Sequence, residues 1–250
     1  MHQDAFCGAL EHEITQFVGS VAVADLSRPV PGCPQWTVTD LAVHMGTIHR
    51  WANHLVAVRS PLRIPSREID VQVPENPADF PEWLREGGDA LISTLRATDL
   101  NFPMWTWGED QHARFWARRM LHETLVHRVD MEQALEAEVR IQPKIAADGI
   151  EELLTNLPYA AYFSPSVVNL CGSGESLVLT ATDLDVCWRI DLPPEGFRWS
   201  REPSSRASVT FRCAAGDLLL VLYRRRGVDV GVTEGDSSVL AHWLEHSALQ

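Results

Sequence analysis

The stretch that decides the fold lies near the middle of the chain and reads Trp116-Ala-Arg-Arg-Met-Leu-His-Glu-Thr-Leu-Val-His-Arg-Val-Asp130. Glu123 and His127 are spaced i and i+4, so a helix places them on one face, where a carboxylate oxygen and an imidazole nitrogen can reach the same ion. His122 lies five positions before His127, which puts the two side chains about 140° apart around a helix. The stretch is therefore not a His-Glu-x-x-His zincin motif, which needs a four-residue step.

A third ligand has to come from another helix, because two ligands do not make a selective metal site. His44 is the best candidate, since it lies in the middle of a helix expected from Thr37 to about residue 59. Thr37 is the expected N-cap of that helix, with Asp40 three residues later in a near capping-box pattern. The sequence thus offers His44, Glu123 and His127 as a candidate ligand set.

A set of two histidines and one glutamate leaves at least one coordination position open, as in catalytic zinc sites. That position would hold water or a substrate sulfur or oxygen. Asp130, one turn beyond His127, is placed to orient an imidazole. The residues alone also allow a simpler interpretation, in which Glu123 and His127 are an ordinary i,i+4 polar pair on an exposed face.

Helical periodicity dominates the first 160 residues. The expected helices span residues 4–26, 37–59, 81–98, 111–138 and 145–157. Residues 60–78 carry four prolines and form a long connection, which in a compact domain is often functional. Trp105 and Trp107 lie on an aromatic loop and are candidate lid residues over a pocket, or else cover for the core.

The pattern changes to short strands toward the carboxyl end. Strands are expected at residues 176–181, 185–190, 207–212 and 218–223, followed by a helix that starts at Asp236 or Ser237. We therefore expect a mainly α fold joined to an α+β fold: a helical bundle over residues 1–160 and a small α+β domain over residues 161–250.

Charge and composition exclude several classes of protein. The chain has 34 acidic and 21 basic residues, a net charge of -13, and no basic half to neutralise phosphates, which argues against nucleic-acid binding. No apolar run is long enough to cross a membrane and no export signal begins the sequence, so a cytoplasmic location is expected. Five scattered cysteines without a Cys-x-x-Cys pair are expected to be reduced.

Two segments together carry a family resemblance. Trp36-Thr-Val-Thr-Asp-Leu-Ala-Val-His-Met-Gly46, followed by Arg119-Met-Leu-His-Glu-Thr-Leu-Val-His-Arg-Val-Asp130, resembles the DinB/YfiT-like metal-dependent family. The resemblance is greater to the actinobacterial branch that includes mycothiol-dependent maleylpyruvate isomerase and mycothiol S-transferases. Residues 214–236 and the expected terminal helix with Trp243 and Leu244 are similar to the small α+β domain appended in that branch.

The resemblance implies a four-helix bundle in which His44, Glu123 and His127 hold a divalent ion, most often zinc. It also implies mycothiol as a thiol cosubstrate, bound as thiolate, that attacks a small electrophilic substrate in thiol transfer or thiol-assisted isomerisation. An arginine of the second domain is expected near the substrate carboxylates. Arg225 is the nearest match, with Arg224 and Arg226 as alternatives.

Two other functions stay open on the sequence. One is a metal-dependent hydrolase in which the ion activates water, and the other is a non-catalytic metal or small-molecule sensor with a protein partner. For the leading function we expect small-molecule partners only, and a monomer or homodimer. Arg119 is expected to pair with an acidic neighbour, whereas His49, His54, His112 and His122 are expected on solvated faces or at helix ends.

Overall fold

The computed structural model describes residues 3–201 and 206–249 of the chain. Its contacts divide the chain into two compact units, Met1–Val139 and Arg140–Gln250. The sequence pattern placed this boundary at residue 160. In the structure, helix α5 (Pro143–Asn156) packs against helix α6 (Ala215–Leu222) and so belongs to the second unit. Periodicity identifies such a helix but not the neighbour that covers its apolar face.

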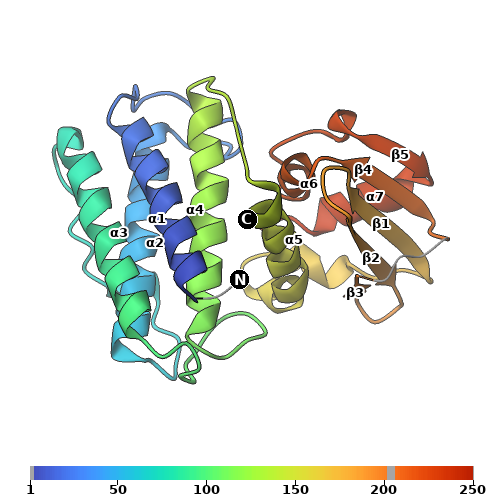
Figure 1. Ribbon diagram of the computed structural model, residues 1–250, viewed down its shortest axis with the longest axis horizontal. Coiled ribbons are helices and arrows are strands. Elements are labelled where there is room, and N and C mark those ends of the chain that lie inside the picture. Colours follow the sequence, from blue (N-terminus) through green and yellow to red (C-terminus); the bar gives the residue numbers. More distant parts are fainter. Residues whose placement is uncertain (1–2, 202–205, 250) are drawn as a thin grey trace. The chain divides into compact units, whose positions relative to one another are not determined.

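The first unit is a four-helix bundle, as expected. Its helices are α1 (Gln3–Val21), α2 (Val38–Val58), α3 (Phe80–Ala97) and α4 (Arg114–Ala134), and they lie side by side in Figure 1. Each of α1 and α2 packs against both α3 and α4. The core between them is closed by fully buried leucines from all four helices, among them Leu10, Leu41, Leu91 and Leu125.

Helix α2 begins where the sequence predicts. The Thr37 side chain accepts a hydrogen bond from the backbone N–H of Asp40, and the Asp40 carboxylate accepts one from the backbone N–H of Thr37, which completes a capping box. The helix ends at Arg59, which adopts a left-handed conformation with φ 53°. The expected long connection follows and contains two short 3₁₀ turns, η1 (Ser66–Glu68) and η2 (Pro77–Asp79).

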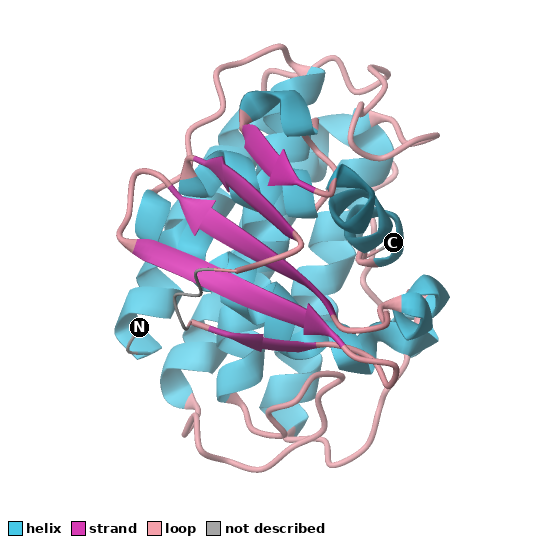
Figure 2. Ribbon diagram, turned by 90° about the vertical axis from the view of Figure 1, so that its right-hand side faces the viewer, coloured by secondary structure: helices cyan, strands magenta, loops and turns pink. Residues whose placement is uncertain are grey.

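The second unit is built on a five-stranded sheet with strand order β3-β2-β1-β4-β5, shown in magenta in Figure 2. The strands are β1 (Glu175–Ala181), β2 (Val186–Leu192), β3 (Arg198–Ser200), β4 (Val209–Cys213) and β5 (Val232–Gly235). β1 and β4 pair in parallel, and the other neighbours pair antiparallel. Helices α6 and α7 (Ser237–His246) pack against β1 and β4. The short 3₁₀ helices are η3 (Leu157–Tyr162), η4 (Pro165–Asn169) and η5 (Val228–Val230).

The strand predicted at residues 218–223 is wrong, because this segment forms helix α6. Its apolar residues are buried on all sides, so their pattern fits a buried helix as well as a buried strand. The backbone N–H of Ala215 donates to Asp183 Oδ1 at 2.8 Å, which satisfies a donor at the helix start that the periodicity does not reveal. Strands β3 and β5 were missed because both are short edge strands.

Within residues 3–201 and 206–249, no helix is both long enough and apolar enough to cross a membrane. All five cysteines lie in this described part of the chain, and no disulfide joins any of them.

Candidate metal centre

The structure brings together the three residues that the sequence nominated. His44 comes from α2, while Glu123 and His127 lie one turn apart on α4. Glu123 Oε1 lies 3.2 Å from His44 Nε2 and 3.4 Å from His127 Nε2. One donor atom from each residue falls within 4.8 Å of the other two. We call His44, Glu123 and His127 the inner group.

Glu123 forms an ion pair with Arg119, whose side chain is only 3% exposed. Arg119 Nη2 donates to Glu123 Oε2 at 3.1 Å, so the expected pairing of Arg119 with an acidic neighbour is confirmed. Because Arg119 takes Oε2, the other oxygen, Oε1, is directed to the two imidazoles. The carboxylate therefore presents one oriented oxygen to the inner group.

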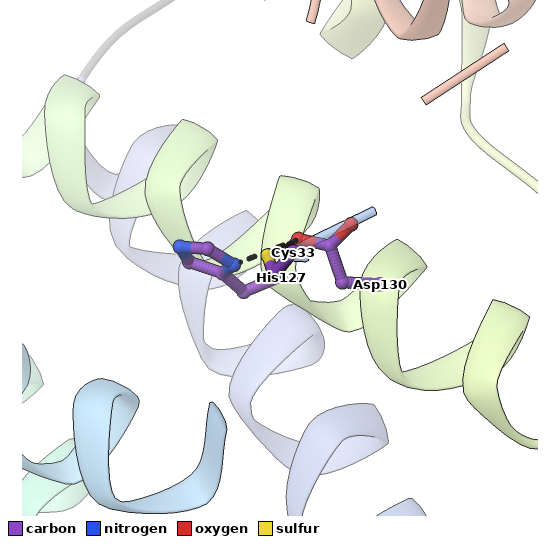
Figure 3. A group of neighbouring side chains, drawn as sticks. All are labelled: Cys33, His127 and Asp130. Carbon is purple, nitrogen blue, oxygen red and sulfur yellow. Dashed lines mark hydrogen bonds and ion pairs between the residues drawn. The ribbon is translucent and has the colours of Figure 1, made fainter. Parts of the chain in front are cut away.

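His127 is oriented through its second ring nitrogen. Its Nδ1 lies 2.9 Å from Oδ2 of Asp130, a fully buried residue one turn further along α4. The Cys33 thiol donates to the same oxygen at 3.4 Å, so Cys33, His127 and Asp130 form a second cluster, shown in Figure 3. An Nδ1–H donor keeps the Nε2 lone pair of His127 for the inner group.

The residues of the inner group and their neighbours shift the pKa values of Glu123 and His127 in opposite directions. Burial opposes the charged form of Glu123, but hydrogen bonds from His127 and His44 and the charge of Arg119 hold the pKa of this carboxyl well below its ordinary value. Burial also favours neutral His127, yet hydrogen bonds with Asp130, Cys33 and Glu123 raise its pKa well above the ordinary value. Both shifts favour a negative Glu123 beside a positive charge.

The inner group fits a divalent ion. Two imidazole nitrogens and one carboxylate oxygen form a donor set used by catalytic zinc, and three protein ligands leave a coordination position for a further molecule. The charge of the group is consistent with this fit, because a cation at Nε2 of His127 would lie beside the carboxylate of Glu123. The chemistry open to the group is therefore Lewis-acid activation of a bound water or thiol.

Trp36 is an aromatic neighbour of the inner group that the sequence did not identify as part of the site. Its ring centroid lies 5.0 Å from that of His44 and 6.2 Å from that of His127, nearly parallel to the latter. The sequence feature that could have identified Trp36 is its position directly before the N-cap Thr37, where its side chain can pack against the first turns of α2.

The tryptophans nominated as lid residues pack against other aromatic rings of the bundle. The Trp105 ring lies 6.0 Å from the ring of Trp116 and 6.3 Å from the ring of Trp51. Trp107 meets Phe115 edge to face at 5.3 Å. These rings form one aromatic cluster where the loop meets α2 and α4. Their role as a lid stays a prediction.

Two histidines expected on solvated faces are buried instead. His49 is 1% exposed and its Nε2 lies 2.9 Å from Thr124 Oγ1, so it links α2 to α4 beside Glu123. Burial lowers the pKa of His49 to about 4. His122 is fully buried. Both predictions failed because α2 and α4 are covered on more sides than an amphipathic pattern shows.

The arginines nominated for the substrate lie in the second unit, just beyond α6. Arg225 Nη1 donates to the carbonyl of Tyr223 at 2.9 Å, and Arg226 forms an ion pair with Asp217. Arg224 is exposed and has a left-handed backbone with φ 59°. The role of Arg225 at the substrate stays a prediction.

Comparisons with known proteins agree with this architecture. The model of a family described as "Mycothiol maleylpyruvate isomerase N-terminal domain" matches residues 7–132, about half of the chain. A crystal structure of the mycothiol-dependent maleylpyruvate isomerase is similar with a TM-score of 0.62 at 15% identity, covering 94% of this chain and 93% of the other. A histidine-to-alanine mutant of that isomerase gives 0.65 with the same identity and coverage. No curated protein sequence matches.

Proposed function

The chain belongs to the mycothiol maleylpyruvate isomerase family, and from this premise we propose that it is a mycothiol-dependent isomerase assisted by a divalent ion. Membership of the family supports an enzyme that uses a thiol cosubstrate. The ion, the residues that bind it and the substrate are the finer parts of the proposal. The observation that carries them is the convergence of His44, Glu123 and His127 on one point between α2 and α4.

His44 Nε2, Glu123 Oε1 and His127 Nε2 are the proposed ligand atoms. An ion such as Zn²⁺ at this place would supply a Lewis acid that favours the thiolate form of a thiol at neutral pH. The other residues prepare the ligands. Asp130 holds the ring of His127, and Arg119 directs the carboxylate of Glu123. The indole of Trp36 stacks on the ring of His127 and is tilted against that of His44.

A thiolate allows isomerisation without net consumption of the thiol. Its sulfur forms a bond to one carbon of a conjugated double bond, whose electron pair moves into the adjoining carbonyl. The former double bond then rotates, the sulfur–carbon bond breaks, and the double bond re-forms as the opposite isomer. If the substrate carries a leaving group instead, the sulfur stays on the product, and the same site performs S-transfer.

The substrate we propose is a small conjugated electrophile that carries carboxylates, with Arg225 as the residue that pairs with one of them. An arginine forms two parallel hydrogen bonds to a carboxylate, which fixes the orientation of the substrate as well as its affinity. We further propose a cytoplasmic location, because a thiol cosubstrate has to remain reduced.

The test is turnover of protein purified without chelator, whose metal content is measured by mass spectrometry. Isomerisation of maleylpyruvate is followed with mycothiol, without thiol, and after removal of the ion, and the products are weighed for retained thiol. We expect activity that needs both thiol and ion. Isomerisation without thiol would contradict the proposal, and a product that has incorporated water would favour a hydrolase. Absence of both turnover and thiol binding would favour a sensor.

A further inference from the structure

We propose that Cys33, His127 and Asp130 form a second metal site, specific for a thiophilic ion such as Cd²⁺ or Zn²⁺, that competes with the inner group for His127. This second site goes beyond the proposed isomerase function, because it includes Cys33, which the proposed isomerase chemistry does not use. We call these three residues the outer group.

The outer group has the composition and spacing of a metal site. A thiol, an imidazole nitrogen and a carboxylate oxygen all lie within 4.8 Å of one another, and Cys33 Sγ lies 3.4 Å from Asp130 Oδ2. Sulfur at about 2.3 Å and oxygen at about 2.0–2.2 Å from a tetrahedral zinc give ligand separations of this order. A thiolate in the set favours soft ions, whereas the inner group of nitrogen and oxygen donors has no such preference.

The position of Cys33 is determined by a tightly hydrogen-bonded loop. The backbone N–H of Cys33 donates to the carbonyl of Val30 at 3.1 Å, and the N–H of Trp36 donates to the carbonyl of Cys33 at 3.0 Å. The N–H of Val30 donates to the carbonyl of Trp36 at 2.9 Å, which closes the loop. The thiol is thereby held beside α4 before any ion binds, which lowers the entropic cost of binding.

His127 belongs to both groups through different nitrogens. Its Nε2 belongs to the inner group and its Nδ1 to the outer group. A neutral imidazole has one lone pair, so an ion on Nδ1 requires the ring proton to sit on Nε2. An ion in the outer group therefore removes His127 as a ligand of the inner group. It also replaces the hydrogen bond between His127 and Asp130 that orients the imidazole ring. A thiophilic ion at Cys33 would thus reduce affinity for the inner ion.

The experiment uses the full chain, stripped of metal and kept reduced with a phosphine rather than a thiol. Cd²⁺ is titrated in while the thiolate-to-cadmium charge-transfer absorption is followed in the ultraviolet. Cys33→Ser removes the proposed sulfur ligand, and Cys171→Ser is the matched control at another partly exposed cysteine. His44→Ala removes a ligand of the inner group only.

We expect the wild-type absorption to saturate at one Cd²⁺ per chain, to fall at least tenfold in Cys33→Ser, and to persist in Cys171→Ser and His44→Ala. Persistence of the absorption in Cys33→Ser, or its absence from the wild type, would overturn the assignment. Loss of the absorption in His44→Ala would also overturn it, because the ion would then depend on the inner group. None of these results depends on turnover. The outer metal site can therefore be disproved while the isomerase function holds, and the isomerase function can be disproved while the outer site holds.

Discussion

His44 Nε2 lies 3.2 Å from Glu123 Oε1, although 79 positions separate the two residues in the chain. The contact joins α2 to α4. It adds His44 to the pair formed by Glu123 and His127, which lie one helical turn apart on α4. Because one partner comes from a different helix, the cluster exists only when the bundle is folded. Binding of an ion there is therefore coupled to the stability of the first unit.

Replacement of His44 by alanine should abolish tight binding of a divalent ion to the inner group, whereas the outer group keeps all its ligands. Removal of one of three protein ligands costs more than loss of a residue that only hydrogen-bonds to a ligand. We therefore expect the affinity of the inner group for the ion to fall by more than about 100-fold. The measurement is competition with a chromophoric chelator. His54→Ala, also on α2, is the control and should bind like the wild type. Equal affinity in His44→Ala would contradict the assignment of this ligand.

Asp130→Asn should weaken ion binding without unfolding the bundle. The neutral amide keeps the shape of the side chain but loses the charge that holds the Nδ1–H of His127, and such changes reduce affinity by about 10- to 100-fold. Circular dichroism checks the fold, and chelator competition measures the affinity. Asp89→Asn, at an exposed position of α3, should leave the affinity unchanged.

Arg128→Met should destabilise the first unit strongly. Arg128 is buried and forms ion pairs with Glu13 and Glu132, so its removal leaves two partly or fully buried carboxylates without their cation. Loss of one member of a buried ion pair costs about 3–5 kcal/mol in the free energy of unfolding. Arg85→Met, which breaks an exposed pair with Glu82, should cost less than about 1 kcal/mol. Urea denaturation of both variants compares the two costs.

The metal-free protein should lose stability on acidification through His49. Its pKa is about 4 in the folded protein against 6.5 for the ordinary residue. Between these values the unfolded chain binds more protons, so the free energy of unfolding rises with pH and falls as pH drops below 6.5. From pH 7 to pH 5 the loss is about 2 kcal/mol.

His49→Gln isolates this effect, because glutamine can donate to Thr124 but does not titrate. The urea midpoints of the variant and the wild type are compared at both pH values, and titrations shared by the two proteins cancel in the difference. An unchanged pH dependence in His49→Gln would show that His49 is not the group responsible.

Arg225→Ala should lower kcat/KM for a substrate with carboxylates by about 10- to 100-fold, the equivalent of one hydrogen-bonded charge pair. Arg224→Ala, at the exposed neighbouring position, should have little effect. Steady-state kinetics with the purified variants tests both expectations. A larger effect in Arg224→Ala would move the substrate contact to that residue.

Local sequence features predicted the helices of the first unit and nominated the inner group, and the family resemblance added the four-helix bundle. Thr37 and Asp40 mark the start of α2 by a capping box, and the i,i+4 spacing of Glu123 and His127 places both on one face of α4. His44 was the third nominee because it lies in the middle of a helix, and the resemblance to a known family pointed to the same residue. Each of these signals acts within a few helical turns, where spacing determines geometry.

Only the tertiary structure decided what surrounds that group. Cys33 lies 97 positions from Asp130, and no periodicity relates the two residues. Packing also buried His49 and placed most of the strand predicted at residues 218–223 in helix α6, because a segment covered on every side lacks the alternation that tells strand from helix. The sequence by itself therefore determined the ligands that share a helix face, whereas the folded chain alone decided which loop residues reach them.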